Sequence, residues 1–412
     1  MVSGGLKGSR EQLSLDLMDA RNHVLAIFGA LEGGLAEDTA EILRQDGLPP
    51  PLWLLGHSAW FQEYWIARNP SRHLGRACPD ASERPASLES RSDDWWGDRR
   101  PARQDGQYPA MATADEVRAY LLNSLEQTLA LLDDTPDEDQ ALHFFRLSLL
   151  HEELHAEQLV ETTQVLGLPL GLAWPTGSAP RPELLVPATR WLLGIDPLVP
   201  GLSLDHERPA HGVAVPEFQI DAQAVSWAQY IEFVDDGAYE RAELWHPDGW
   251  AWLIGGGQSS AQFAAPPGRA PRFVEQIGGA SGAVLQRRLG QLVRARGDQP
   301  VTHVSWWEAD AWCRWAGRRL PAEVEWDLMA HSRSGKGFRW GDVLEWTGTT
   351  AGPYPGFTPE PANTHPLPAR GTHKVMRGAS GFSRSVLRRP SLRRFASPGS
   401  NHHFSGFRSC AL

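Results

Sequence analysis

The chain has 412 residues, 41% of them hydrophobic, and carries 50 acidic against 39 basic residues, for a net charge of −11. This length exceeds what one hydrophobic core usually serves, so we expect two domains. The acidic balance argues against general nucleic-acid binding, which needs a basic footprint. Nine of the basic residues and none of the acidic ones lie after Glu360. We expect this basic stretch to fold and pair with the acidic remainder, with one or two arginines facing the functional site.

The cysteine pattern, the N-terminal residues and the length of the apolar runs bear on the cellular compartment. Three cysteines, Cys78, Cys313 and Cys410, match neither a disulfide framework nor a zinc knuckle. The first residues lack the apolar core of a secretory signal, and no apolar run approaches the ~20 residues that span a bilayer. We therefore expect a soluble, cytoplasmic protein without membrane partners.

The first part of the chain predicts helices. Apolar residues recur with a 3.6-residue period from position 13 to 35. Pro51 suits the first turn of a second helix over 51–68, and Thr113 with Glu116 makes a capping-box pattern for a third that reaches Leu132. A fourth follows Pro136 and runs to position 166. Four such helices with few strand signals predict an antiparallel bundle.

The second part has a different pattern. Residues 167–188 are rich in proline and glycine, which is typical of a linker. Beyond them come short β-like runs at 212–215 and 218–220, helices at 227–235 and 306–316, and a predicted loop over 255–272. This arrangement indicates an α+β domain rather than alternating βαβ units.

A pair of histidines in the fourth predicted helix carries the clearest chemical signal. His151 and His155 stand four residues apart in HEELHAE at 151–157. Residues i and i+4 share a helix face, so both imidazoles can converge on one ion. His57, in the second helix, is a candidate for the third ligand of an open catalytic site. Three imidazoles suit iron, zinc or copper, and Glu157 can orient one of them.

Two other interpretations of the pair stay open. Histidines in a glutamate-rich helix can belong to a solvated face that binds no metal. The run also matches the zinc-protease signature HExxH, with Glu152 as general base. The extended signature requires glycine and histidine where this chain has Gln158 and Glu161, which counts against the protease.

A set of motifs in the second part resembles the formylglycine-generating-enzyme-like domain, a relative of C-type lectins. The motifs are PVTHVSW at 300–306, ADAWCRWAG at 309–317, RLPAEVEW at 319–326, EWT at 345–347, RGAS at 377–380 and GFR at 406–408. Formylglycine-generating enzymes work through a pair of cysteines, whereas Cys410 has no neighbouring partner here. Cys313, in a tryptophan-rich segment, is interpreted as a core residue. The resemblance therefore implies the fold without sulfatase activation.

Together with a DinB-like four-helix bundle that bears the three histidines, this domain resembles the ergothioneine-biosynthesis sulfoxide synthases and selenoneine synthases. The resemblance implies domains at 10–168 and 190–412 joined by a linker at 169–189. It also implies that His57, His151 and His155 hold a non-haem Fe(II). The activity implied is an O2-dependent oxidoreductase reaction that joins a chalcogen to the imidazole of hercynine, the trimethylated betaine of histidine.

Departures from the family pattern bear on the donor of the chalcogen. Sulfoxide synthases usually carry glutamine where this chain has Leu154, and Arg394-Phe395-Ala396-Ser397-Pro398 replaces their usual motif before a proline. In the family such positions hold hercynine or the carboxylates of cysteine or γ-glutamylcysteine. Their loss favours a selenosugar donor and a carbon–selenium bond. A thiol donor and a carbon–sulfur bond remain the alternative, and a non-catalytic metal- or betaine-binding protein is the alternative of another class.

Substrate chemistry suggests further residues. A trimethylammonium group favours aromatic faces, for which Phe395 and Trp346 are candidates, and a carboxylate favours arginine, here Arg394 or Arg388. The resemblance implies a tyrosine proton donor near the iron, and Tyr354 lies in a comparable loop. Core packing, surface charge and turn packing are the ordinary roles of these residue types. The run Asn401-His402-His403 is a weaker metal candidate, because adjacent side chains usually diverge.

Overall fold

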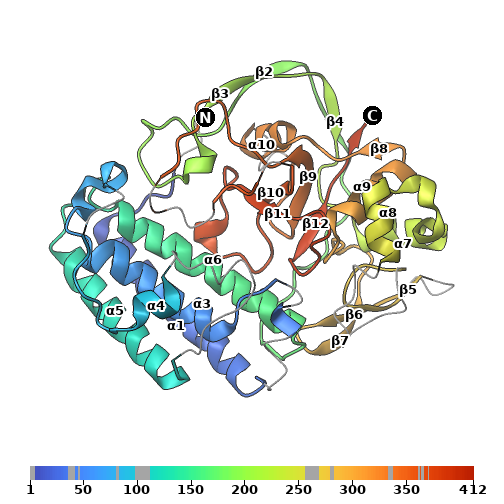
Figure 1. The fold of residues 1–412 in the computed structure, drawn as a ribbon. Helices are drawn as coiled ribbons and strands as arrows, with labels where there is room; N and C mark the ends of the chain where they lie inside the picture. The colour runs from blue at the N-terminus through green and yellow to red at the C-terminus, as the bar shows by residue number, and fades with distance from the viewer. Residues whose placement is uncertain are drawn as a thin grey trace.

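The computed structural model describes residues 5–35, 42–44, 47–79, 83–97, 112–255, 269–278, 283–332, 337–360, 362, 366–369 and 371–412. Its N-terminal part is helical and its C-terminal part mixes short helices with small sheets, which confirms the α+β class (Figure 1). The longer helices of the N-terminal part are α1 (Arg10–Glu32), α3 (Pro51–Gln62), α5 (Ala114–Asp133) and α6 (His143–Val165).

Local sequence signals explain where three of these helices begin. Ser9 caps α1, Pro51 occupies the first turn of α3, and Thr113 makes the predicted capping box with Glu116. After α3, five residues continue as a π-helical turn, η1 (Glu63–Ala67). The predicted helix over 51–68 is therefore continuous, with α-helical hydrogen bonds first and π-helical ones at its end.

The predicted start of the fourth helix was wrong. Residues 136–142 form turns and α6 begins only at His143. The carboxylate of Asp139 accepts hydrogen bonds from the Arg146 guanidinium at 2.7 Å and from the Gly201 amide at 2.8 Å. Contacts with a distant segment thus hold these residues in turns, and the local periodicity cannot reveal such contacts.

The strands of the C-terminal part form small sheets. The predicted β runs are confirmed, and most pairs are antiparallel, although β12 runs parallel to β9. In spatial order the sheets are β1 (Leu184–Val186), β4 (Phe218–Ile220), β13 (Cys410–Ala411) and β8 (Arg318–Arg319); β11 (Arg394–Ala396), β10 (Lys374–Gly378), β9 (Leu344–Thr350) and β12 (Ser405–Phe407); β2 (Thr189–Leu193) and β3 (His211–Val215); and β5 (Val274–Gly278), β6 (Ala283–Arg288) and β7 (Gln291–Ala295). Strand β1 lies inside the predicted linker. Its three residues are too few to give a strand signal among the prolines and glycines of that segment.

Short helices also occur, most of them in the C-terminal part. The predicted helices appear as α7 (Trp227–Asp235) and α9 (Trp306–Trp315). Three more were not predicted: α4 (Ser92–Trp96), α8 (Pro247–Ile254) and α10 (Glu323–Ser332). Of the predicted loop over 255–272, residues 256–268 lie outside the described residues. Single turns occur at η2 (Arg72–Ala77), η4 (Asp205–Glu207), η5 (Ala238–Glu240), η6 (Ala242–Leu244) and η7 (Ser385–Leu387).

Helix α6 lies between the bundle and the C-terminal part (Figure 1). Almost every residue of α6 is buried, and a helix buried all round must satisfy its polar side chains within the protein. The apolar core of the bundle also includes side chains from the C-terminal part, among them Leu204, Leu392 and Phe404. The two parts therefore share one core along α6.

The basic C-terminal stretch pairs with acidic residues, as the charge asymmetry predicted. Arg377 binds Glu323 at 3.1 Å and also Asp327, and Arg408 binds Glu345 at 2.5 Å, all of them buried. Further pairs join Arg384 to Glu153, Arg389 to Glu207, Arg393 to Glu323 and Arg394 to Glu157. Among the described residues, no helix has the length and apolar character needed to cross a membrane.

Candidate metal centre and adjoining pocket

Three histidines converge in the bundle. His57 comes from α3, and His151 and His155 come from adjacent turns of α6. One ligand atom from each lies within 4.8 Å of the others, and the ring centroids are 4.2 to 5.5 Å apart. The i, i+4 spacing places two rings on one face of α6, and the packing of α3 against that face supplies the third. The predicted ligand set is thus brought together in space.

Hydrogen bonds orient two of these rings. The Nδ1 atom of His57 lies 2.8 Å from the carbonyl oxygen of Trp96, which can only accept. The hydroxyl of Ser58 donates to the carbonyl of Leu54 and lies 2.7 Å from Nδ1 of His155. Both Nδ1 atoms therefore carry the proton, and in this tautomer Nε2 is the ring nitrogen with the lone pair. Such outer hydrogen bonds are typical of histidines that bind metals.

Aromatic rings enclose the cluster. Trp53 stacks on His57 with centroids 4.5 Å apart, and Phe61 stacks on His151 at 4.1 Å. All three histidines are buried. Three buried imidazoles, two of them in a tautomer set by hydrogen bonds, fit a divalent transition metal of the iron or zinc class. The solvated-face interpretation of the pair is therefore wrong.

Glu152 has a structural partner that excludes the protease role. Its carboxylate accepts two hydrogen bonds from the Arg21 guanidinium, at 2.5 and 3.1 Å, and both side chains are buried. Arg21 comes from α1, so Glu152 points toward that helix. A carboxylate held in a buried bidentate pair is not free to act as a general base.

Other glutamates of α6 face the C-terminal part. Burial raises the pKa of Glu153 to about 7, although the nearby Arg384 opposes this shift. Glu157 accepts hydrogen bonds from the hydroxyls of Ser380, at 3.0 Å, and Ser383, and pairs with Arg394. The sequence suggested that Glu157 orients a histidine. In the structure its carboxylate contacts the C-terminal part instead.

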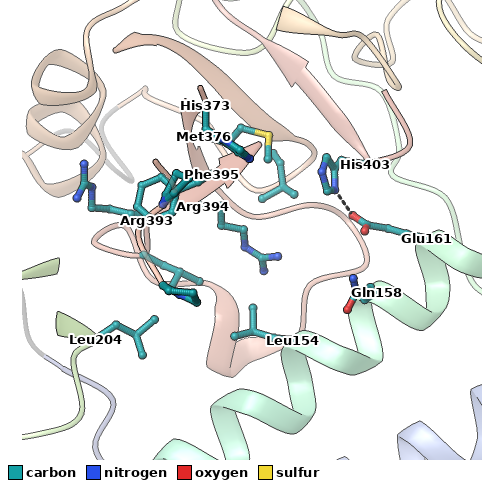
Figure 2. Close-up of a pocket in the computed structure, with 14 residues that line it drawn as sticks. Leu154, Gln158, Glu161, Leu204, His373, Met376, Arg393, Arg394, Phe395 and His403 are labelled. Carbon is teal, nitrogen blue, oxygen red and sulfur yellow. Dashed lines mark hydrogen bonds and ion pairs between the residues drawn. The ribbon is translucent and has the colours of Figure 1, made fainter. Parts of the chain in front are cut away.

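A pocket of about 260 Å³ lies along α6, at the segment of the helix that carries His151 and His155, although none of the three cluster histidines lines it. Leu154, the chain neighbour of His155, lines it together with Gln158, and Arg394 points into its middle from β11 (Figure 2). The remaining lining residues are Glu161, Leu204, Leu344, Pro366, Pro368, His373, Met376, Leu392, Arg393, Phe395 and His403. Both parts of the chain build this pocket.

The structure separates the predicted substrate residues into two groups. Leu154, Arg394 and Phe395 line the pocket. Trp346 does not, because it is fully buried in the C-terminal core and donates to the Val304 carbonyl at 2.7 Å. Arg388 does not either, since its guanidinium donates to three backbone carbonyls, those of residues 341, 380 and 383. Neither side chain lies where it could contact a molecule in this pocket.

Tyr354 also lies away from the histidine cluster. Its hydroxyl donates to Glu323 at 3.1 Å, and the side chain lines a different pocket. Burial and the adjacent Glu323 carboxylate raise its pKa well above the ordinary value. The structure thus does not bring Tyr354 together with the three histidines, where the sequence had predicted a proton donor.

The cysteines do not form a redox pair. Cys78, Cys313 and Cys410 are buried free thiols, and burial raises the pKa of Cys313 and of Cys410 well above the ordinary value. A thiol held protonated is a poor nucleophile and a poor metal ligand. This agrees with a formylglycine-generating-enzyme-like fold without sulfatase activation.

Sequence reasoning missed several residues of the site. Gln158 stands one turn beyond Leu154, so the helical period that paired His151 with His155 would have placed it on the pocket wall. Ser58 adjoins His57 in sequence. The contribution of Trp96 is a backbone carbonyl, which no side-chain motif indicates.

Comparisons with known proteins agree with this architecture. The DinB superfamily model matches residues 17–159, and the sulfatase-modifying factor enzyme 1-like domain model matches residues 177–356. The chain is 30% identical to a hercynine oxygenase of Mycolicibacterium smegmatis over 97% of this chain and 98% of that relative. It is 29% identical to a hercynine oxygenase of Mycolicibacterium thermoresistibile, over 97% and 94%. A formylglycine-generating enzyme of Streptomyces coelicolor is 32% identical over 41% of this chain and 54% of that enzyme.

Proposed function

This chain belongs to the hercynine oxygenase family, and from that premise we propose that it is an iron-dependent oxygenase that acts on hercynine. The convergence of His57, His151 and His155 on one point is the observation that carries the proposal. Near-full-length similarity to two hercynine oxygenases supports the substrate.

The three histidines would hold the iron through Nε2 of His57 and of His155 and a ring nitrogen of His151. When bound, Fe(II) supplies the means to activate O2 and leaves positions for the reacting groups. The Trp96 carbonyl and the Ser58 hydroxyl keep the imidazoles in the ligand-competent tautomer. Trp53 and Phe61 exclude water from the ring faces.

The adjoining pocket offers partners for both ends of hercynine. Arg394 is a cation on the pocket wall, and its pairing with Glu157 holds it in one place without removing its capacity to bind a carboxylate. Phe395 offers an aromatic face for the trimethylammonium group. Its ring already has one cation nearby, since the guanidinium carbon of Arg393 lies 5.1 Å from its centroid.

The donor is proposed to be a selenosugar, with formation of a carbon–selenium bond. Of the described lining residues, Arg393 is the only arginine besides Arg394, and it is fully engaged. It donates to both oxygens of Glu323, at 2.7 and 3.1 Å, and to the carbonyls of His206 and Gly352. Among the described lining residues, Arg394 is thus the arginine left to pair the carboxylate of hercynine, which supports a donor that brings no second carboxylate. A sugar needs no such partner.

The test is anaerobic reconstitution of the full chain with Fe(II), followed by hercynine and either a selenosugar, cysteine or γ-glutamylcysteine. O2 is then admitted, its consumption is recorded, and products are identified by mass spectrometry. We expect a hercynine adduct with the selenium isotope pattern, formed at least tenfold faster than any sulfur adduct. His151→Ala, matched by His73→Ala on the exposed η2 turn, reports whether turnover requires the cluster.

Each outcome decides one part of the proposal. A sulfur adduct as the main product would overturn the selenosugar donor and leave the hercynine oxygenase in place. No O2 uptake with any donor would favour a non-catalytic metal- or betaine-binding protein. Full turnover by His151→Ala would overturn the ligand assignment.

A further inference from the structure

A second cluster of metal-ligating side chains lies on the pocket wall away from Leu154. Glu161, His402 and His403 each offer one ligand atom, and these atoms lie within 4.8 Å of one another. The imidazoles of the two adjacent histidines do not diverge as expected. Their ring centroids are 4.0 Å apart, because the chain bends at this point before it enters β12. A loop and a helix thus bring three ligand atoms together as in a chelate.

The cluster is distinct from the first one. Glu161 stands six residues beyond His155 on α6, which corresponds to about 9 Å along the helix axis. An ion held by Glu161 is therefore too far from the three-histidine cluster to share a ligand with it. Figure 2 shows His403 reaching down to Glu161 at one side of the pocket, with Gln158 and Leu154 farther along the same helix.

We propose that Glu161, His402 and His403 bind a second divalent transition-metal ion. Two imidazoles and one carboxylate form a ligand set that suits zinc and iron. Three protein ligands leave coordination positions open, and two of the three residues, Glu161 and His403, line the pocket. An ion held there would lie at the pocket wall, where an anionic group of a bound molecule could complete its coordination.

Local charges both favour and oppose this ion. Glu161 is almost fully buried, and a buried carboxylate gains from a cation beside it. Arg272 is the opposing charge, because its guanidinium lies close enough to affect His402. The Arg272 guanidinium has other contacts. It donates a hydrogen bond to the side-chain oxygen of Asn401 at 3.4 Å, and its Cζ atom lies 4.8 Å from the centroid of the Phe273 ring.

A simple hydrogen bond is the competing explanation. Nδ1 of His403 lies 2.9 Å from Oε1 of Glu161, and this pair needs no metal. The two explanations differ in what they require of His402. A hydrogen bond between Glu161 and His403 makes no use of His402, whereas a three-ligand site loses one ligand when His402 is removed.

The experiment measures metal content and does not depend on catalytic activity. The full chain is stripped with a chelator, incubated anaerobically with Zn(II) alone, passed through gel filtration and assayed by inductively coupled plasma mass spectrometry. We expect two ions per chain for the wild type, one for His402→Ala, one for His151→Ala and none for the double variant. His373→Ala, a pocket histidine outside both clusters, is the matched control and is expected to retain two.

Loss of folding is excluded by the design. His403→Gln keeps a hydrogen-bond donor for Glu161 but removes an imidazole, so it should also retain one ion while its circular dichroism stays unchanged. One ion in the wild type together with one in His402→Ala would overturn the second site and leave the first intact. Two ions in His402→Ala would equally overturn it. One ion in the wild type and none in His151→Ala would do the same.

Discussion

Gly56 connects the packing of the bundle to the orientation of a metal ligand. It precedes His57 in α3, and a Cβ atom at this position would lie 2.0 Å from Cε2 and 2.1 Å from Nε1 of the Trp96 ring. Carbon atoms in contact lie about 3.5 to 4.0 Å apart. Gly56→Ala therefore requires the Trp96 ring to move by about 1.5 Å.

The surroundings of Trp96 resist this movement. The side chain is fully buried, and its ring stacks on Tyr120 with centroids 5.2 Å apart. Overpacking of this kind costs about 1 to 3 kcal/mol. Alanine regains about 1 kcal/mol over glycine in a helix. We therefore expect Gly56→Ala to lower the free energy of unfolding by up to about 2 kcal/mol.

The effect on metal binding follows from the backbone. The carbonyl of Trp96 accepts the hydrogen bond that orients His57, so a displaced residue 96 loosens that ligand. Loss of an outer hydrogen bond typically lowers metal affinity by about 10- to 100-fold. The assays are urea denaturation followed by tryptophan fluorescence, and competition for Fe(II) against a chelator of known affinity.

Gly29→Ala is the matched control. Gly29 lies in α1, is exposed, and would place no Cβ within 4 Å of another group. It should stabilise the protein by about 0.5 to 1 kcal/mol and leave metal affinity unchanged. If Gly56→Ala were as stable as Gly29→Ala and bound Fe(II) like the wild type, the link from Gly56 through Trp96 to His57 would be refuted.

Three further predictions test other contacts. Ser58→Ala removes the partner of His155 Nδ1 and should weaken Fe(II) binding by about 10- to 100-fold in the chelator assay without a change in circular dichroism; equal affinity would count against this orienting role. Arg21→Met leaves the buried Glu152 charge uncompensated and should cost about 3 to 5 kcal/mol of unfolding free energy, whereas the double change with Glu152→Met should restore most of it. Burial, and secondarily nearby arginines, lowers the pKa of His143 from its usual value of 6.5 to about 3. Between these pH values the unfolded chain binds a proton that the folded chain does not, so stability falls as the pH drops below 6.5. His143→Gln should flatten this fall by up to about 1.4 kcal/mol per pH unit, measured by urea denaturation at pH 5 and 7; an unchanged slope would contradict it.

The sequence was informative wherever a signal is local. The capping box at Thr113 and the pairing of His151 with His155 depend only on neighbours within one or two turns of a helix, so helix geometry alone determines them. The motifs of the C-terminal part, which identify a fold, were equally readable. Residue type alone was a poor guide to the pocket. Trp346 and Arg388 have the right chemistry for hercynine, but the same chemistry also packs a core and satisfies backbone carbonyls.

Tertiary structure decided which distant residues meet. His57 reaches the other two histidines because α3 packs against α6, and Arg394 reaches the pocket because β11 lies opposite that helix and Glu157 holds its guanidinium. His402 and His403 lie together beside Glu161 because the chain bends before β12. The physical reason is one of range: a helix determines positions within a few residues, whereas contacts between elements depend on how their buried surfaces pack.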